Sequence, residues 1–345
     1  MLKLIKYPVS NICIKKVLLM VFVSFLLINS GFGQNKDYTI VKAKSGDGIY
    51  SLLKSNGLSP ELYSDEFIRL NKDKIGKNNR IFAGNEYKIP KADKNTKTGK
   101  TIRTYAIFGE DYKKVEIIDD QLKGAVFYMV AGHGGPDPGA VGSYNKQTLC
   151  EDEYAYDVTL RASRYLIQHG ALVYVIVRDQ NDGIRDASIL IPDKDEYCYP
   201  DKKIPLSQNA RLGQRKNIIN KLYKKYRGRY QRAVVIHVDS RNKGQDIDVF
   251  FYYYKKSKKG KKLCDNLQQT FTAKYKKYQP TRGYGGSVSA RGLYMLRYAH
   301  PVTTYIELGN INHPRDQKRL IKKENRDALA KWLVDGLIKD FKNNR

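Results

Sequence analysis

The chain has 345 residues, 41% hydrophobic and 28% charged, which is enough for a small module and one domain with a substantial core. Its 63 lysines and arginines outnumber its 35 aspartates and glutamates, for a net charge of +28. The cations are scattered in short runs that match no nucleic-acid motif. This argues against nucleic acid as a partner and favours an anionic envelope polymer or an acidic membrane surface.

The first 33 residues have the composition of a secretory signal peptide. Four lysines precede the apolar run Val17–Ile28, and small residues follow as far as Gly33. That run, about 12 residues long, is shorter than the roughly 20 residues that an uncleaved membrane anchor needs. We therefore expect residues 1–33 to be removed, leaving an exported protein of the periplasm or cell envelope with no stable membrane span.

Residues 38–90 predict a small α+β module in the order strand, helix, helix, strand. Gly46 and Asp47 suit the turn and the N-cap before the first helix, Asn71 ends the second helix, and Gly84–Pro90 forms the last strand. These features resemble a LysM peptidoglycan-binding module, in which a Gly-Asp turn, a helix-ending asparagine and a Gly-x-x-hydrophobic-x-Ile-Pro strand recur. The resemblance implies binding to peptidoglycan, and a generic small α/β spacer is the alternative.

Residues 91–101 are almost entirely polar and predict a solvated linker, which places a second domain at residues 102–345. In that domain apolar runs of strand type alternate with amphipathic helices. The alternation predicts an α/β fold with a mainly parallel sheet flanked by helices. The expected strands are 105–108, 115–118, 124–130, 171–177, 233–236, 247–253 and 302–308, and the expected helices are 151–169, 208–226, 261–278 and about 325–341.

Three of these strands end near side chains of types that can bind a metal ion or move a proton. His133 lies in a loop, residues 131–140, that contains four glycines and two prolines, His237 ends a second strand, and Glu307 ends a third. The C-terminal ends of parallel strands meet at one edge of a sheet, so we expect the three side chains to converge. Glu307, set between two apolar residues, would be costly to bury without a cation or a donor nearby.

A fourth participant is expected at the start of the helix that begins near residue 151. Glu151 shares the apolar stripe of that helix with Ala155 and Val158, whereas the row of Glu153 is polar and is expected to face water. We therefore assign Glu151 to the site. Glu153 is the alternative if the helix has a different register.

Two imidazoles and one carboxylate around an ion with an open position for water are typical of a catalytic zinc site. We expect one Zn²⁺ per chain, bound by His133, Glu151 and His237. A bound ion would activate water and polarise a carbonyl, which leaves Glu307 free to move the proton from that water to a leaving amine.

Five segments together are similar to the zinc-dependent N-acetylmuramoyl-L-alanine amidases over about residues 122–342. They are residues 132–140, the helix from Glu151 to Gly170, and residues 175–179, 236–240 and 306–316. The resemblance implies zinc binding by His133, Glu151 and His237 and a catalytic role for Glu307. It also implies hydrolysis of the amide between N-acetylmuramic acid and the L-alanine of the stem peptide.

The resemblance also suggests a contact between Arg297 and a substrate carboxylate, with a solvated surface charge as the alternative. Peptidoglycan is the expected partner, together with an activating envelope protein, and the long connection 181–205 is a candidate lid. Two other functions stay open: a catalytically silent wall-binding or envelope scaffold, and a zinc peptidase that cuts within the stem peptide. Cys150, Cys198 and Cys264 permit one disulfide or none.

Overall fold

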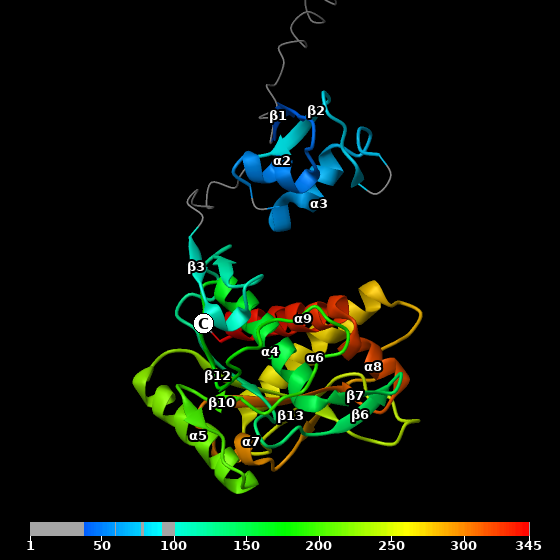
Figure 1. The fold of residues 1–345 in the computed structure, drawn as a ribbon. Helices are drawn as coiled ribbons and strands as arrows, with labels where there is room; N and C mark the ends of the chain where they lie inside the picture. The colour runs from blue at the N-terminus through cyan, green and yellow to red at the C-terminus, as the bar shows by residue number, and fades with distance from the viewer. Residues whose placement is uncertain (1–37, 59, 77–78, 92–100, 345) are drawn as a thin grey trace, which may run out of the picture. The chain divides into compact units, whose positions relative to one another are not determined.

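The computed structural model describes residues 38–58, 60–76, 79–91 and 101–344. The expected signal peptide and most of the expected linker lie outside the described residues. The chain divides into two units between residues 98 and 99, and the described residues of each unit form a compact body (Figure 1). Among the described helices, none combines the length and the apolar composition needed to cross a membrane.

The first unit contains β1 (Tyr38–Lys42), α2 (Ile49–Ser55), α3 (Pro60–Leu70) and β2 (Glu86–Pro90), and its two strands pair antiparallel. Asn71 follows α3 and joins it to β2, because its side chain donates to the Lys88 carbonyl and accepts from the Lys88 amide, both at 2.7 Å. The expectation that Asp47 caps α2 is wrong. Gly48 is the N-cap, and the Asp47 carboxylate accepts a hydrogen bond from the Lys44 amide in the preceding turn.

The second unit is built on a six-stranded sheet in the order β14-β13-β15-β12-β5-β8. Four of its five pairings are parallel and one, β13 with β15, is antiparallel, which confirms the predicted mainly parallel sheet. The strands are β5 (Val126–Ala131), β8 (Leu172–Val175), β12 (Gln231–Asp239), β13 (Phe250–Tyr253), β14 (Ser287–Ala290) and β15 (Val302–Asn310).

Helices cover both faces of this sheet, and alternate residues of each strand point to opposite faces. The helices are α4 (Glu151–Gln168), α5 (Gln208–Lys225), α6 (Lys258–Tyr278), α7 (Tyr294–Tyr298), α8 (Pro314–Ile321) and α9 (Lys323–Lys342). Helices α6 and α9 lie on one side of the sheet and α5 and α7 on the other (Figure 1). Phe127, Met129 and Val234 pack with residues of α6 and α9, whereas Tyr128 and Val235 pack with residues of α5 and α7.

The expectation that one side of α4 faces water is wrong. Glu153, Asp157 and Arg161 are all at most 4% exposed. Asp157 bonds both Arg161 and the fully buried Arg326 of α9, and Glu153 pairs with Arg185. The polar row of α4 is therefore covered by α9 and by the segment 181–205, which neutralise its charges with arginines.

Short paired strands complete this unit. They are β3 (Ile102–Thr104) with β4 (Lys114–Glu116), β6 (Val141–Tyr144) with β7 (Gln147–Cys150), and β9 (Val177–Arg178) with β10 (Tyr197–Cys198) and β11 (Lys202–Lys203). The strand expected at residues 105–108 is wrong, because Ala106–Phe108 forms a 3₁₀ turn, η2, that buries Phe108. The expected strand at residues 115–118 shortens to β4, and the segment 181–205 is held to the body of the unit by β10.

Candidate metal centre

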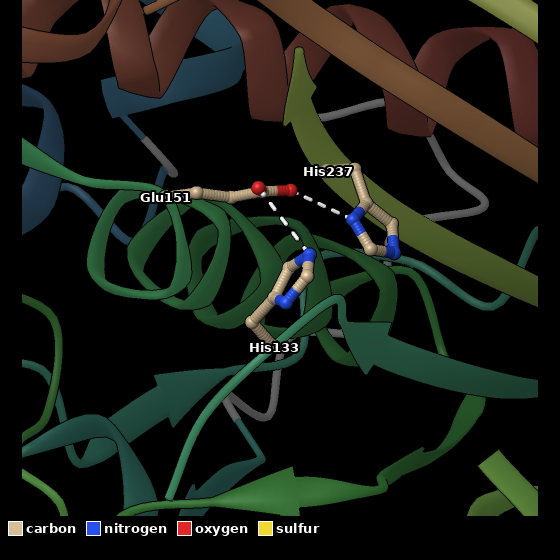
Figure 2. A group of neighbouring side chains, drawn as sticks. All are labelled: His133, Glu151 and His237. Atoms are coloured by element: carbon tan, nitrogen blue, oxygen red, sulfur yellow. Dashed lines mark hydrogen bonds and ion pairs between the residues drawn. The ribbon is translucent and has the colours of Figure 1, made fainter. Parts of the chain in front are cut away.

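Three strand ends and one helix start meet at a single edge of the central sheet. β5 ends at Ala131, two residues before His133, and His237 of β12 lies directly beside Glu307 of β15 in the parallel register. Glu151 is the first residue of α4. The expected convergence of the three strand ends is therefore present. Glu151 points at the two imidazoles (Figure 2), and Glu153 is not in this group.

The Glu151 carboxylate lies between the two histidines. Its Oε1 is 2.7 Å from Nδ1 of His237 and its Oε2 is 3.3 Å from Nε2 of His133. Backbone amides fix both oxygens, since Ala140 donates to Oε2 at 2.8 Å and Val238 donates to Oε1 at 3.0 Å. Each of the three residues offers a ligand atom, and these atoms lie within 4.8 Å of one another, so one small cation fits among them.

The glycine-rich loop brings His133 close to Glu151. Gly139 has φ of +70°, and a Cβ there would lie 2.6 Å from Oε2 of Glu151 and 2.7 Å from the His133 ring. Only glycine meets both the positive φ and the close approach. The glycines of this loop are therefore part of the geometry of the centre.

Asp137 orients His133 from the other side. Its Oδ2 lies 3.0 Å from Nδ1 of His133 and accepts a hydrogen bond from Nη2 of Arg211 at 2.6 Å. An imidazole whose Nδ1 is turned toward a carboxylate presents Nε2 to an ion, which is how outer carboxylates set the tautomer of metal-binding histidines. Arg215 supports the same loop by donating to the carbonyls of Gly132 and His133.

His237 is held between a glycine and a tyrosine. Its ring stacks on Tyr305 with the centroids 4.3 Å apart and the planes 14° from parallel. On the other side, a Cβ at Gly132 would overlap the ring. The imidazole is therefore fixed in position, with Nδ1 turned to Glu151.

Charge at the centre is balanced between the acid and the imidazoles. Burial lowers the pKa of His237, and it would also lower that of His133, but the carboxylates of Asp137 and Glu151 raise the pKa of His133 to about 9. Burial favours the neutral form of Glu151, yet its hydrogen bonds with both histidines hold its pKa below the usual range. Glu151 is thus ionised, the state in which a carboxylate binds a cation.

Glu307 sits beside this group with one unsatisfied oxygen. Its Oε2 is buried and has no hydrogen-bond partner in the described part of the chain. Burial, with the negative charges of Glu151 and Asp239, raises the pKa of Glu307 well above its ordinary value. A buried acid in this state calls for a cation, a water molecule or a substrate group within reach.

A hollow of about 170 Å³ opens on the face of the sheet that α5 and α7 cover. Besides His133 and His237, it is lined by Val130, Gly132, Asp137, Gln208, Arg211, Leu212, Arg215, Val235, Leu293, Tyr294, Met295 and Tyr305. Arg297 is not among these residues: it is exposed on α7 and lines a neighbouring hollow. Nor does any residue of 181–205 line the hollow at the two histidines.

The remaining candidates lie apart from the centre or have other roles. Glu153 belongs to a separate group of buried acids with Asp152 and Glu196. Cys150, Cys198 and Cys264 are all buried and free, and burial raises the pKa of the Cys150 thiol to about 11. None of the three is in a disulfide; the sequence had allowed either one disulfide or none.

Sequence reasoning missed the residues that support the centre. Tyr305 precedes Glu307 by two residues and therefore lies on the same face of β15, so strand alternation was a usable signal for it. Arg211 and Arg215 carried no such signal, because they lie on α5 about 80 residues from the loop that they support. Their roles depend on the tertiary fold.

A family model described as N-acetylmuramoyl-L-alanine amidase matches residues 128–339. The germination-specific N-acetylmuramoyl-L-alanine amidase of Bacillus subtilis is 25% identical over 224 residues, which cover 64% of this chain and 81% of that protein. Among solved structures, the CwlD amidase of Clostridioides difficile, in complex with the GerS lipoprotein, is 21% identical over 64% of this chain and 98% of its own, with a TM-score of 0.48. The amidase AmiC2 of Nostoc punctiforme is 18% identical over 64% of this chain and 98% of its own, with a TM-score of 0.45.

Proposed function

The chain belongs to the N-acetylmuramoyl-L-alanine amidase family, and on that premise we propose that it is an exported, zinc-dependent peptidoglycan amidase. The substrate bond is the amide between the lactyl group of N-acetylmuramic acid and the L-alanine of the stem peptide. The observation that carries the proposal is the Glu151 carboxylate held between His133 and His237, with Glu307 next to it at the same sheet edge.

The side chains present fit a zinc ion. His133, Glu151 and His237 supply the two nitrogens and one oxygen that catalytic zinc sites use, and their number leaves an open coordination position. The unsatisfied oxygen of Glu307 and the two glycines that clear space for the rings support the same assignment. A bound zinc ion supplies Lewis-acid chemistry, polarising both the scissile carbonyl and the attacking water.

In the proposed reaction the protein positions the amide and moves one proton. Burial and the negative charges nearby raise the pKa of Glu307, and a cation bound at the centre would offset them and favour its ionised form. In that form Glu307 accepts a proton from the attacking water as the water oxygen bonds to the lactyl carbonyl carbon. The same carboxyl then gives that proton to the nitrogen of L-alanine as the C–N bond breaks. The first products are a lactyl carboxylic acid on the glycan and a stem peptide with a free amine. The acid then loses its proton and the amine gains one, so the final products are a carboxylate and an ammonium group, and atoms and charges balance.

The first unit is proposed to act as a LysM-like wall-binding module. The order of its elements and the Asn71 bridge between α3 and β2 support this assignment. Linked binding of this kind raises the effective concentration of an enzyme on a polymer without new contacts at the active site. Export through the segment 1–33 would bring both units to the wall, where an activating envelope protein is a further proposed partner.

A chelation experiment tests the zinc-dependent step. Purified sacculi are incubated with the full chain, with the chain after chelation, and with the chelated chain after zinc is restored, and the release of soluble peptide is followed. We expect release, loss of release and recovery, in that order. Full activity after verified metal removal contradicts a zinc mechanism, and binding to sacculi without any release supports the silent scaffold instead.

A further inference from the structure

A second hollow, of about 430 Å³, has four cationic side chains and no acidic side chain in its lining. Its charged side chains are Lys255, Lys256, Arg291 and Arg297, and its other lining residues are Tyr254, Ala290 and Gly292. All four cations are exposed, and within the described part of the chain no carboxylate lies at ion-pair distance from any of them. The lining therefore carries four uncompensated charges.

This absence of carboxylates distinguishes the hollow from the arginine-rich hollow beside Trp332. The hollow beside Trp332 contains Arg282, Arg315 and Arg319. There, each arginine is paired with a carboxylate, drawn from Asp246, Asp248 and Asp316. The arginines of that hollow are used within the protein, and of its cations only Lys318 has no ion-pair partner among the described residues, whereas all four cations of the second hollow are available to a ligand.

The four-cation hollow adjoins the metal centre through one short segment. Leu293, Tyr294 and Met295 line the hollow at the two histidines, while Arg291 and Arg297, on either side of them, line the cationic one. The same stretch of chain thus forms a wall of both spaces.

A row of aromatic rings on one face of the sheet also connects the two places. The Arg291 guanidinium lies 4.8 Å from the ring centroid of Tyr252, the Tyr252 and Tyr305 rings are 6.2 Å apart, and Tyr305 stacks on His237 at 4.3 Å. These three steps together span at most about 15 Å, and an extended peptide advances about 3.3–3.6 Å per residue, so a residue about four or five positions beyond the scissile amide can reach the cations.

We propose that this hollow binds free carboxylates of the stem peptide, on the amine side of the bond that is cut. The inference rests on the proposed amidase function and extends it to substrate specificity. Lysine and arginine side chains bind carboxylates through charge-assisted hydrogen bonds, and a hollow without acids repels no part of such a ligand. Lys255, Lys256, Arg291 and Arg297 are then specificity-determining residues and take no part in bond cleavage.

The test compares two muramyl peptides that differ only in whether the peptide carboxylates are free or amidated. The zinc-loaded full chain should cleave the free form with a KM roughly tenfold lower, with similar kcat, and this preference should shrink as salt is added. The double variant Lys255→Gln/Lys256→Gln should raise KM for the free form by about fivefold or more and leave KM for the amidated form unchanged.

The matched control removes the same charge elsewhere. Lys221 and Lys224 are exposed on α5 and line neither hollow, so Lys221→Gln/Lys224→Gln should leave both KM values unchanged. Equal KM values of the wild type for the two peptides, or an equal loss in the control variant, overturn the inference while the amidase function stands. If neither peptide is cleaved, the proposed function fails.

Binding of the released stem peptide provides a readout that does not need turnover. In calorimetric titrations, the wild type should bind the free-carboxylate peptide several-fold more tightly than the amidated one, and Lys255→Gln/Lys256→Gln should abolish the difference. Equal binding of the two peptides by the wild type contradicts the inference whether or not the chain is active.

Discussion

The Glu151 carboxylate is 2.7 Å from Nδ1 of His237, although the two residues are 86 positions apart in the sequence. Two backbone amides fix the same carboxylate, so it is preorganised to face the imidazole nitrogens. A group of donors held this closely is suited to a cation, because the acid is ionised and buried at once.

Replacing Glu151 should abolish most of the zinc binding at the centre. Glu151→Gln removes the negative charge between the histidines with little change in shape, and we expect metal content to fall from about one zinc per chain to a small fraction of that. Elemental analysis of the purified protein measures this directly. The matched control is Glu153→Gln, two residues along α4, which should keep its zinc because Glu153 pairs with Arg185. The reverse pattern would assign the metal to Glu153.

Gly139→Ala should damage the centre without unfolding the domain. The added methyl carbon would lie 2.6 Å from Oε2 of Glu151, so either Glu151 or His133 must move. We expect activity to fall at least about 100-fold, since misplacement of reacting groups by an ångström has effects of this size. Gly228→Ala is the control, because Gly228 also has positive φ but an added methyl carbon there would meet no atom within 4 Å. Comparable activity of the two variants would argue against a close-packed centre.

Asp137 is expected to act by positioning His133. Asp137→Ala should weaken zinc binding by about 10- to 100-fold, the usual effect of losing an outer carboxylate, and Asp137→Asn should recover part of it because its amide oxygen keeps a partial negative charge beside Nδ1 of His133. Competition with a zinc-binding dye measures the affinity. If Ala and Asn variants bind zinc as the wild type does, Asp137 has no positioning role.

The buried ion pair between Arg326 and Asp157 should matter for stability. Arg326 is fully buried, its Nε donates to Asp157 at 2.7 Å, and its Nη2 donates to the carbonyls of Arg185 and Ala187. Arg326→Met leaves the Ala187 carbonyl without this donor, while Asp157 and the Arg185 carbonyl keep their bonds with Arg161, and we expect the variant to lower the free energy of unfolding by about 1–3 kcal/mol. Urea denaturation measures the change. The exposed pair of Lys331 with Asp327 is the comparison, and Lys331→Ala should cost less than about 1 kcal/mol.

The three cysteines of the second unit should be unreactive in the native state. Burial raises the pKa of Cys150 and Cys198 to about 11 and that of Cys264 to about 12, so at pH 8 almost none of each is thiolate. In a chain with Cys13→Ser, a thiol reagent should label none of them within minutes at pH 8 and all three after denaturation. Fast labelling of one native thiol would show that it is accessible, and fewer than three after denaturation would indicate a disulfide.

The convergence at the metal centre could be predicted from sequence because it depends on local pattern and one rule of topology. Apolar runs that end at His133, His237 and Glu307 indicate three strands, and parallel strands gather those ends at one edge. The phase of α4 then selected Glu151. No distance was needed for any of these steps.

The environment of Glu153 could not be predicted in the same way. Its row on α4 is polar, and such a row usually faces water, but Arg185 and Arg326 come from segments 32 and more residues away and cover it. A polar helix face buried by distant arginines has the same sequence pattern as a solvated one. The 3₁₀ turn at residues 106–108 was missed for a related reason, since a short apolar run does not distinguish a strand from a buried turn.

Mass spectrometry of the peptides released from purified sacculi tests the proposed reaction most directly. The wild-type chain should release stem peptides that begin with a free L-alanine amino group and leave glycan strands with intact lactyl carboxylates, and Glu307→Gln should release none. Peptides that begin at any later residue, or equal release by Glu307→Gln, would contradict cleavage of the lactyl amide by this centre.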